Sequence, residues 1–219
     1  MKRFLLVCVA TLGLLQSAFA QEEKKFEFGG GASYGIGLSK GQPNSYGFDL
    51  FGGYKFNPNF TVGLGINYTN YFGRTDLPSG DENLYILTGQ YHAFRPYLYT
   101  RYDFLPDRKW SPYIGAKFGY AFFSDTIYNY GWVERTPGLH YGNVPAEYEH
   151  FLTDPPKTLG IGNNFFGTID MGVSRRIGNR DNRLSLGVSL DFQPMKFNYN
   201  NSTVKKFTPT VGPFAKLNF

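Results

Sequence analysis

From Phe26 onward, apolar positions alternate with small or polar positions along most of the chain. In residues 26–39, Phe28, Tyr34 and Ile36 fall on one parity, and the intervening positions hold Glu, Gly or Ser. A period of two residues places each parity on its own face of an extended strand. Seven further segments follow the same rule: residues 47–56, 60–69, 96–104, 113–122, 165–174, 184–193 and 211–219. We therefore predict eight strands, each about as long as the ~9–11 residues that a tilted strand needs to cross a bilayer.

Charged residues in these segments fall on the polar parity. Because an Arg or Lys on a lipid-facing position costs ~2–4 kcal/mol at the bilayer midplane, this sorting favours an all-β, antiparallel, up-and-down transmembrane barrel. Arg175 is an exception on the apolar parity, near a strand end where its side chain could reach the headgroups. We expect the inward charges to form an ion-paired network in the lumen, drawn from Asp49, Lys55, Arg101, Asp103, Lys117, Asp170, Arg176, Asp191 and Lys216.

This network has two interpretations. An eight-stranded barrel is just wide enough to be filled by side chains, so the charges could simply neutralise one another in a closed lumen. Ionisable groups at membrane depth can also mark a gated ion path. The first interpretation is favoured, and the second stays open.

A soluble barrel of lipocalin type would bury the apolar parity around a ligand and turn the pattern inside out. Its solvent face would then be rich in Phe, Tyr, Leu and Ile, which is too apolar to leave in water. The polar parity is rich in Gly and Ser, as a narrow and crowded lumen requires. The membrane orientation is therefore preferred.

The connections between strands differ in length. Residues 57–59, 106–111 and 178–183 are short, whereas 72–95 and 124–162 are long and 194–206 is intermediate; the first outer connection, 40–45, is also short. Short periplasmic turns and longer outer loops are typical of transmembrane barrels. Residues 84–94 also carry strand-like residues, which could extend the second outer hairpin above the membrane or add strands, giving a count of ten.

The first 20 residues resemble a secretory signal peptide. Lys2 and Arg3 are followed by an apolar stretch over residues 4–15, which is too short for a transmembrane helix. Small residues then form a cleavage site, defined by Ala18, Ala20 and Gln21. We expect cleavage after Ala20, one barrel domain over residues 21–219, and location in a bacterial outer membrane. A lipoprotein signal ending at Cys8 would leave almost no apolar segment to recognise.

The composition narrows the possible functions. Cys8 is the only cysteine, so a mature chain without it has no disulfide, zinc–thiolate site or cysteine nucleophile. The net charge of +5 includes Lys2 and Arg3, and the mature chain shows no basic run that would indicate nucleic-acid binding. The sequence predicts no cofactor, no metal and no catalytic residue.

The long third connection holds the remaining candidate chemistry. His140, Glu147, Glu149 and His150 could in principle bind a metal, but their spacing matches no known ligand motif. A hydrolase is unsupported too, since no segment combines a nucleophile, a base and an orienting group. Tyr and Trp are residue types that anchor protein contacts. We therefore expect surface exposure of this connection, with either an extracellular partner or packing over the barrel mouth, through Tyr128, Tyr130, Trp132, Tyr141 and Tyr148.

Three segments resemble the small outer-membrane barrels of the OmpA-like and porin-family group. They are residues 53–65, residues 111–120 and the terminal Leu217-Asn218-Phe219. The resemblance implies that the final strand is read by the barrel-assembly machinery through Ala215, Leu217 and Phe219, although Phe214 stands where that signal usually has Gly. OmpA-like proteins often add a peptidoglycan-binding domain, which we do not expect here. The expected role is a non-enzymatic component of the envelope or the cell surface that contacts outer-membrane lipid. A narrow channel for ions or small solutes is the alternative, and an outer-membrane enzyme comes third.

Overall fold

The structure is a computed structural model that describes residues 25–78, 84–124, 128–141, 144–152, 159–178, 182–199 and 202–219. The predicted signal peptide lies outside these residues, together with its cleavage site at Ala18, Ala20 and Gln21. Among the described residues, no helix is long and apolar enough to cross a membrane.

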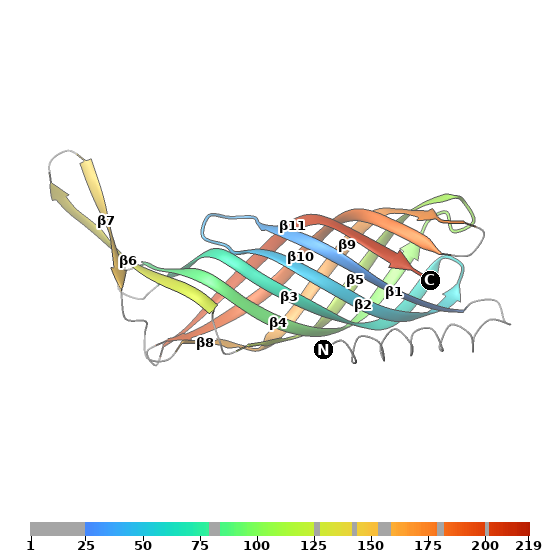
Figure 1. Ribbon diagram of the computed structural model, residues 1–219, viewed down its shortest axis with the longest axis horizontal. Coiled ribbons are helices and arrows are strands. Elements are labelled where there is room, and N and C mark those ends of the chain that lie inside the picture. Colours follow the sequence, from blue (N-terminus) through green and yellow to red (C-terminus); the bar gives the residue numbers. More distant parts are fainter. Residues whose placement is uncertain are drawn as a thin grey trace.

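Eight antiparallel strands close into a barrel (Figure 1). They are β1 (Phe26–Gly37), β2 (Asn44–Asn57), β3 (Phe60–Pro78), β4 (Leu84–Asp103), β5 (Trp110–Phe123), β9 (Asn164–Arg176), β10 (Arg183–Tyr199) and β11 (Ser202–Asn218). Each strand pairs with its neighbour along the chain except where β5 pairs with β9, and β1 pairs with β11 to close the ring. The expected eight-stranded barrel is confirmed.

The two ends of the barrel differ. One end, here called the turn end, carries the short connections at residues 58–59 and 104–109, together with the end of β9 at Arg176 and the start of β10 at Arg183. The opposite end, here called the loop end, carries the connection at residues 38–43 and the longer hairpins. In Figure 1 the turn end lies to the right, beside the C-terminus, and the loop end lies to the left.

The apolar parity faces outward. Leu50, Leu64 and Phe118 are each more than half exposed, whereas the intervening Asp49 and Thr61 are buried. This is the orientation that the charge sorting predicts, with the apolar side chains outside and the polar ones in the lumen.

Toward the loop end, this polarity inverts without a change in strand geometry. On β10 the inward position 191 is Asp, but the inward Met195 and Phe197 are fully buried apolar residues. The outward side changes in the opposite sense, from Val188 to Lys196. Apolar-inside and polar-outside is the pattern of a strand surrounded by water, so the inversion marks where the strands leave the apolar zone.

The strands consequently run further than the sequence predicts. Residues 72–95 were expected as a connection, but β3 continues to Pro78 and β4 begins at Leu84. Residues 194–206 were also expected as a connection, but β10 and β11 remain paired up to Tyr199 and Ser202. Residues 84–94 extend the second outer hairpin and add no strand to the ring, so the ten-stranded count is wrong.

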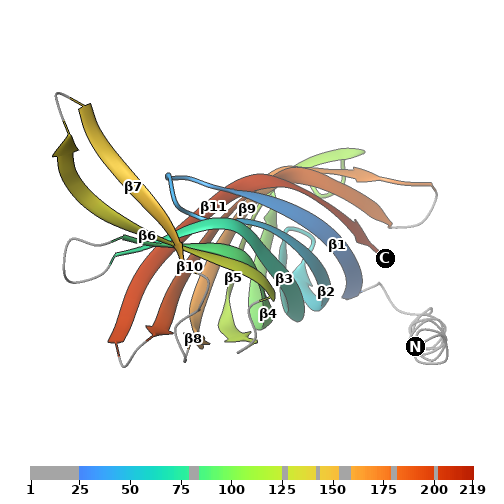
Figure 2. The same cartoon turned by 60° about the vertical axis from the view of Figure 1, so that its left-hand side comes forward.

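The third connection contains three further strands. β6 (Tyr128–Tyr141) pairs with β7 (Val144–Leu152) and with the loop-end part of β4, while β8 (Leu159–Gly162) pairs with β10. Figure 2 shows the β6–β7 hairpin projecting from the loop end as an arm outside the barrel ring. The expected loop over residues 124–162 thus contains the β6–β7 arm and a short strand, β8, that pairs with β10.

The β2–β3 turn offers a local test of stability. The side-chain Oδ1 of Asn57 accepts hydrogen bonds from the backbone N of Asn59 at 2.9 Å and of Phe60 at 2.8 Å. Asn57→Ala removes the acceptor of both bonds, and we expect it to lower the free energy of unfolding by about 1 kcal/mol, measured by urea titration of the refolded protein. Asn57→Asp keeps the acceptor and should cost much less. Equal losses in the two variants would contradict this account of the turn.

Candidate functional site

The lumen is the candidate site, because the inward parity of all eight barrel strands meets there. Three groups of charged residues occupy it in sequence from the turn end to the loop end. We call them the turn-end cluster (Arg101, Asp103, Arg183), the central cluster (Asp49, Lys117, Asp170, Lys216) and the loop-end cluster (Arg95, Asp191).

The central cluster joins four strands through two lysines and two aspartates. Lys117 Nζ lies 2.9 Å from Asp49 Oδ2 and 3.7 Å from Asp170 Oδ2. Lys216 Nζ lies 2.5 Å from the same Asp170 oxygen, and Ser189 donates a hydrogen bond to Asp170 Oδ1 at 2.8 Å. The charges balance within the cluster, as buried ions require if they are to stay ionised.

The turn-end cluster is organised by Arg101. Its Nε and Nη2 donate to the two carboxylate oxygens of Asp103 at 2.9 and 2.8 Å, which is a bidentate pair. The remaining guanidinium donors reach Ser174 and Ser185, and the guanidinium carbon lies 3.9 Å from the ring centre of Tyr113. Five partners thus hold one buried arginine, counting both oxygens of the carboxylate.

The loop-end cluster contains an arginine that the sequence analysis did not propose. Arg95 Nη2 donates to Asp191 Oδ1 at 2.5 Å, and Thr168 donates to the same oxygen at 2.5 Å. The Arg95 guanidinium lies 3.7 Å over the ring of Phe166 and also donates to the Tyr71 hydroxyl at 3.3 Å. The Arg95 guanidinium therefore has a carboxylate, a hydroxyl group and an aromatic ring as partners.

Above the loop-end cluster, apolar and aromatic side chains fill the barrel. We call this group the aromatic cap: Tyr71, Tyr91, Phe123, Met195 and Phe197. The Tyr71 and Tyr91 rings stack at 5.3 Å, and the Tyr91 hydroxyl donates to Met195 Sδ at 3.4 Å. The cap is buried throughout, so the barrel is closed by packed side chains at its loop end.

Glycines on β2 and β3 make room for large rings from β4. A Cβ atom on Gly53 or Gly63 would overlap Tyr99, and one on Gly65 would overlap Tyr97. Both tyrosines are buried in the lumen. The abundance of Gly on the inward parity therefore reflects close packing across a narrow barrel.

Two small cavities remain between the clusters. One of about 40 Å³ lies between the central and loop-end clusters, and one of about 30 Å³ lies between the turn-end and central clusters. Lys117 lines both of them. Each volume corresponds to about two to four water molecules. The side chains of the central cluster separate the two spaces, of which the first has mixed polar and apolar walls and the second is lined mainly by apolar and aromatic surface.

The predicted network residues divide into two sets. Asp49, Arg101, Asp103, Lys117, Asp170, Asp191 and Lys216 lie in the three clusters. Lys55 and Arg176 lie nearer the turn end: Lys55 pairs with Glu27 at 3.6 Å with a quarter of its side chain exposed, and Arg176 donates to the Pro106 carbonyl at 3.4 Å. Arg175 faces outward as expected, 5.2 Å from the ring of Trp110.

Sequence analysis missed Glu27, Arg95 and Arg183. Glu27 and Arg95 both carry the parity of the inward charges, which could have identified them. The predicted strand begins at Pro96, which leaves Arg95 in a connection, and the predicted turn over residues 178–183 includes Arg183. A rule that every charge on the inward parity belongs to the lumen would have found all three.

Other predicted sites have different outcomes. Ala215 and Leu217 lie on the outward side of β11 at the turn end, and Phe219 follows the strand by one residue on the same parity; their role in assembly stays a prediction. Phe214 points into the lumen against Gly187 and lies 6.3 Å from the ring of Tyr113.

The candidate chemistry of the third connection lies on the β6–β7 arm, whose side chains are outside the described residues. These are His140, Glu147, Glu149 and His150, with the aromatic residues Tyr128, Tyr130, Trp132, Tyr141 and Tyr148. In the described part of the chain, no group of three or more His, Cys, Asp or Glu side chains could hold a metal ion.

Comparison with known proteins gives a consistent result for the fold. Residues 5–202 match the family model described as outer membrane protein beta-barrel domain. The solved structure of OprG from Pseudomonas aeruginosa is similar at a TM-score of 0.50 and 12% identity, covering 89% of this chain and 94% of that chain. Neisserial surface protein A gives a TM-score of 0.48 and 14% identity, covering 89% and 96%. No curated protein sequence matches. At these identities the structural likeness concerns the fold alone.

Proposed function

This chain belongs to the outer membrane protein β-barrel domain family, and we propose that it is a non-enzymatic component of the outer membrane with an envelope-structural or surface-interaction role. The observation that carries the proposal is the filled lumen. Three clusters of paired charges and an aromatic cap occupy the space that a pore would need. Any contact with an extracellular partner is then made by the part of the barrel that extends beyond the membrane.

The orientation follows the rule for this class of barrel, in which short turns face the periplasm and longer hairpins face outward. The turn end is accordingly periplasmic and the loop end extracellular. β3 and β4 have 19 and 20 residues, well beyond the ~9–11 that cross a bilayer. The surplus residues and the β6–β7 arm supply the surface through which an extracellular partner would bind.

Lumen chemistry supports a structural role for the inward charges. Each cluster pairs opposite charges at hydrogen-bond distance, and serine or threonine hydroxyls occupy further donor or acceptor positions. Such an arrangement holds the strands in register. Each charged side chain of the three clusters has a partner of opposite charge. The barrel-assembly machinery and outer-membrane lipid remain the expected partners during and after insertion.

A narrow channel is the second candidate, favoured by the two small cavities on either side of Lys117. Movement of that one side chain away from Asp49 and Asp170 would be needed to join them. The ion pairs oppose this movement, since it would leave the buried Asp49 carboxylate without its ammonium partner while Asp170 would keep only Lys216.

Conductance across a planar bilayer separates the two candidates. The refolded chain from Gln21 onward is expected to give no stable openings at moderate voltage, because the central cluster and the cap close the lumen. Folding should be verified in the same samples by gel electrophoresis, in which a folded barrel changes its mobility when it is boiled. Stable openings whose amplitude changes in Lys117→Ala would contradict the proposal and establish the channel.

A further inference from the structure

We propose that the outward lysines at the loop end of β10 and β11 form a binding surface for the phosphate groups of the outer-leaflet glycolipid. The inference goes beyond the surface role proposed above and takes from it only the orientation of the barrel. It concerns the outside of the wall, where the lumen clusters play no part.

The first observation is a pair of like charges. Lys196 on β10 and Lys205 on β11 are directly opposite in the strand register. Both lie on the outward side, because the intervening Met195 and Phe197 are fully buried in the barrel. Like charges at directly opposed positions destabilise a sheet. An anion bound between the two ammonium groups would reverse this effect, since each would then form a charge-assisted hydrogen bond.

The second observation is the position of this pair relative to the apolar zone. Phe207 lies two residues from Lys205 on the same face of β11, and its ring stacks with that of Phe192 on β10 at 6.1 Å. Two residues of a strand span about 6.6 Å. The ammonium groups therefore lie about one headgroup layer beyond an outward aromatic pair, and the lysine stems can lie along the surface between them.

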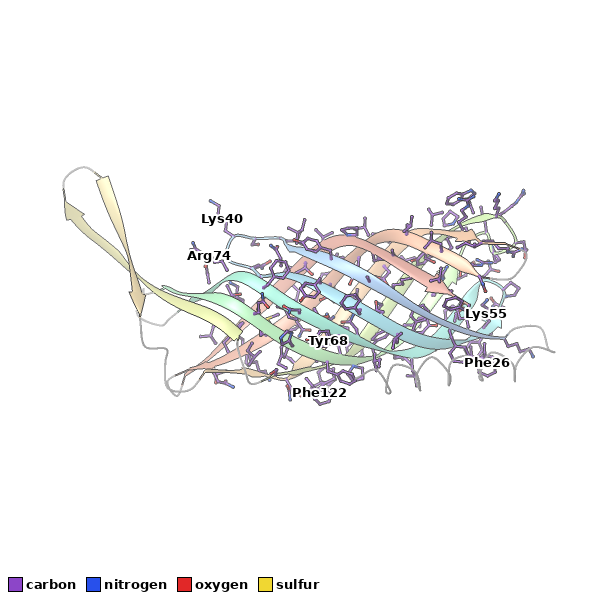
Figure 3. All side chains as sticks on the ribbon, viewed as in Figure 1. Phe26, Lys40, Lys55, Tyr68, Arg74 and Phe122 are labelled. Carbon is purple, nitrogen blue, oxygen red and sulfur yellow. The ribbon has the colours of Figure 1, made fainter. Side chains whose placement is uncertain are left out.

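The third observation is that neighbouring segments add positive charge to the same sector. The connection between β1 and β2 is fastened to β11, since Gln42 Nε2 donates to the Phe207 carbonyl at 3.2 Å and Lys206 donates to the Gly41 carbonyl. This brings Lys40, next to Gly41, to the rim beside β11. Figure 3 shows Lys40 and Arg74 together at the loop end, far from Lys55 at the turn end.

Charge balance in this sector favours an anionic ligand. Arg74 is paired with Asp76 at 2.6 Å, and the Asp76 amide donates to the Gly41 carbonyl at 3.0 Å. Among the described residues of this sector, the Asp76 carboxylate is one negative charge beside four positive charges, which are Lys40, Arg74, Lys196 and Lys205. We call the surface formed by Lys40, Lys196 and Lys205 the lysine rim.

The chemistry of the ligand follows from where the rim points. Its side chains face away from the barrel axis at headgroup height, where the polar groups of outer-leaflet lipid lie. Lysine is a compact point charge that binds phosphate without requiring a planar, bidentate geometry. A phosphorylated sugar headgroup with acyl chains would place its phosphates at the rim and its chains against Phe192 and Phe207.

Lipid binding in detergent micelles tests the proposal directly. The refolded chain in uncharged detergent would be titrated with bisphosphorylated lipid A, with the same lipid lacking its phosphates and with inorganic phosphate. Native mass spectrometry would measure the bound fraction. The test variant is Lys196→Gln/Lys205→Gln, and the matched control is Arg108→Gln/Lys109→Gln, which removes two exposed cations at the turn end.

The wild type and the control should bind the phosphorylated lipid equally. A cation at a charged lipid surface contributes about a fivefold gain in affinity, so the rim variant should bind about 25-fold more weakly. Phosphate-free lipid should bind weakly to all three proteins. Unchanged affinity in the rim variant, or equal affinity for the two lipids, would overturn the proposal. Inorganic phosphate binding as tightly as the lipid would also overturn it, because the site would then serve free phosphate.

Stability without lipid provides a second readout that does not depend on ligand choice. Because Lys196→Gln/Lys205→Gln removes a repulsive pair, this variant should unfold at the same urea concentration as wild type or a higher one. Phosphorylated lipid should stabilise wild type more than the variant. A variant that is less stable in the absence of lipid would contradict the repulsion on which the inference rests. Neither lipid binding nor urea unfolding depends on conductance. A failure of the lysine-rim proposal can therefore be distinguished from a failure of the proposed function.

Discussion

Replacing Lys117 by Met is expected to lower the free energy of unfolding by about 3–5 kcal/mol, the cost of removing one partner from a buried ion pair. Lys117 Nζ contacts the carboxylates of both Asp49 and Asp170. Asp170 would keep Lys216, but Asp49 is 3% exposed and its Oδ2 would lose the ammonium group at 2.9 Å. Urea unfolding of the refolded barrel in detergent measures the effect.

Two further variants separate charge compensation from packing. Lys55→Met removes a lysine whose partner Glu27 keeps a hydrogen bond from Tyr99, and it should cost about 1 kcal/mol or less because the pair is partly exposed. Lys117→Met/Asp49→Leu removes both charges of the buried pair and should be more stable than Lys117→Met alone. A double variant no more stable than the single variant would show that Asp49 does not depend on Lys117.

Replacing Leu64 by Arg is expected to cost about 2–4 kcal/mol more than replacing it by Ala, because position 64 faces the lipid near the middle of the membrane-crossing segment of β3, residues 60–69. Leu64 is 68% exposed, so neither substitution removes much protein packing. The difference between Arg and Ala therefore reports the surroundings of the side chain. Unfolding of the barrel in lipid vesicles measures it.

The matched position is Phe56, which is 65% exposed and lies at the turn end. The cost of Arg relative to Ala should fall to about 0–1 kcal/mol there, since the penalty for a charge decreases toward the membrane interface. A soluble barrel would show a small difference at both positions. Equal penalties at positions 56 and 64 would contradict the proposed depth of these residues.

The strands of the membrane zone could be predicted from sequence because one physical rule acts along their whole length. Lipid outside and a narrow polar lumen inside impose a period of two, and the parity of Leu64 or Asp49 follows at once. The eight segments of the prediction correspond to the eight strands of the ring.

The extension of the strands could not be predicted by that rule, because the rule reverses beyond the apolar zone. Tyr91 and Phe197 lie inward where the membrane pattern requires polar residues, while Gln90 and Asn198 lie outward. Alternation persists, but its sign changes as lipid is replaced by water. A search for a change of sign along an unbroken period would have extended β4 and β10.

The site was predictable as a set of inward charges but not as pairs. Lys117 and Asp49 are 68 residues apart, and Arg95 and Asp191 are 96 apart. Which charges meet depends on how far neighbouring strands are offset, and that offset accumulates around the ring. The parity of each residue is a local property of the sequence, whereas its partner is set by the closure of β1 on β11.

Lipid-edited solid-state NMR tests the central claim most directly, since it needs no substitution. Magnetisation would be transferred from acyl-chain protons to the side chains of the reconstituted protein. Signals are expected from outward Leu50, Leu64 and Leu186, and none from inward Thr61 and Thr168. Transfer to Thr61 and Thr168 with none to the three leucines would contradict the assignment of the apolar parity to the lipid.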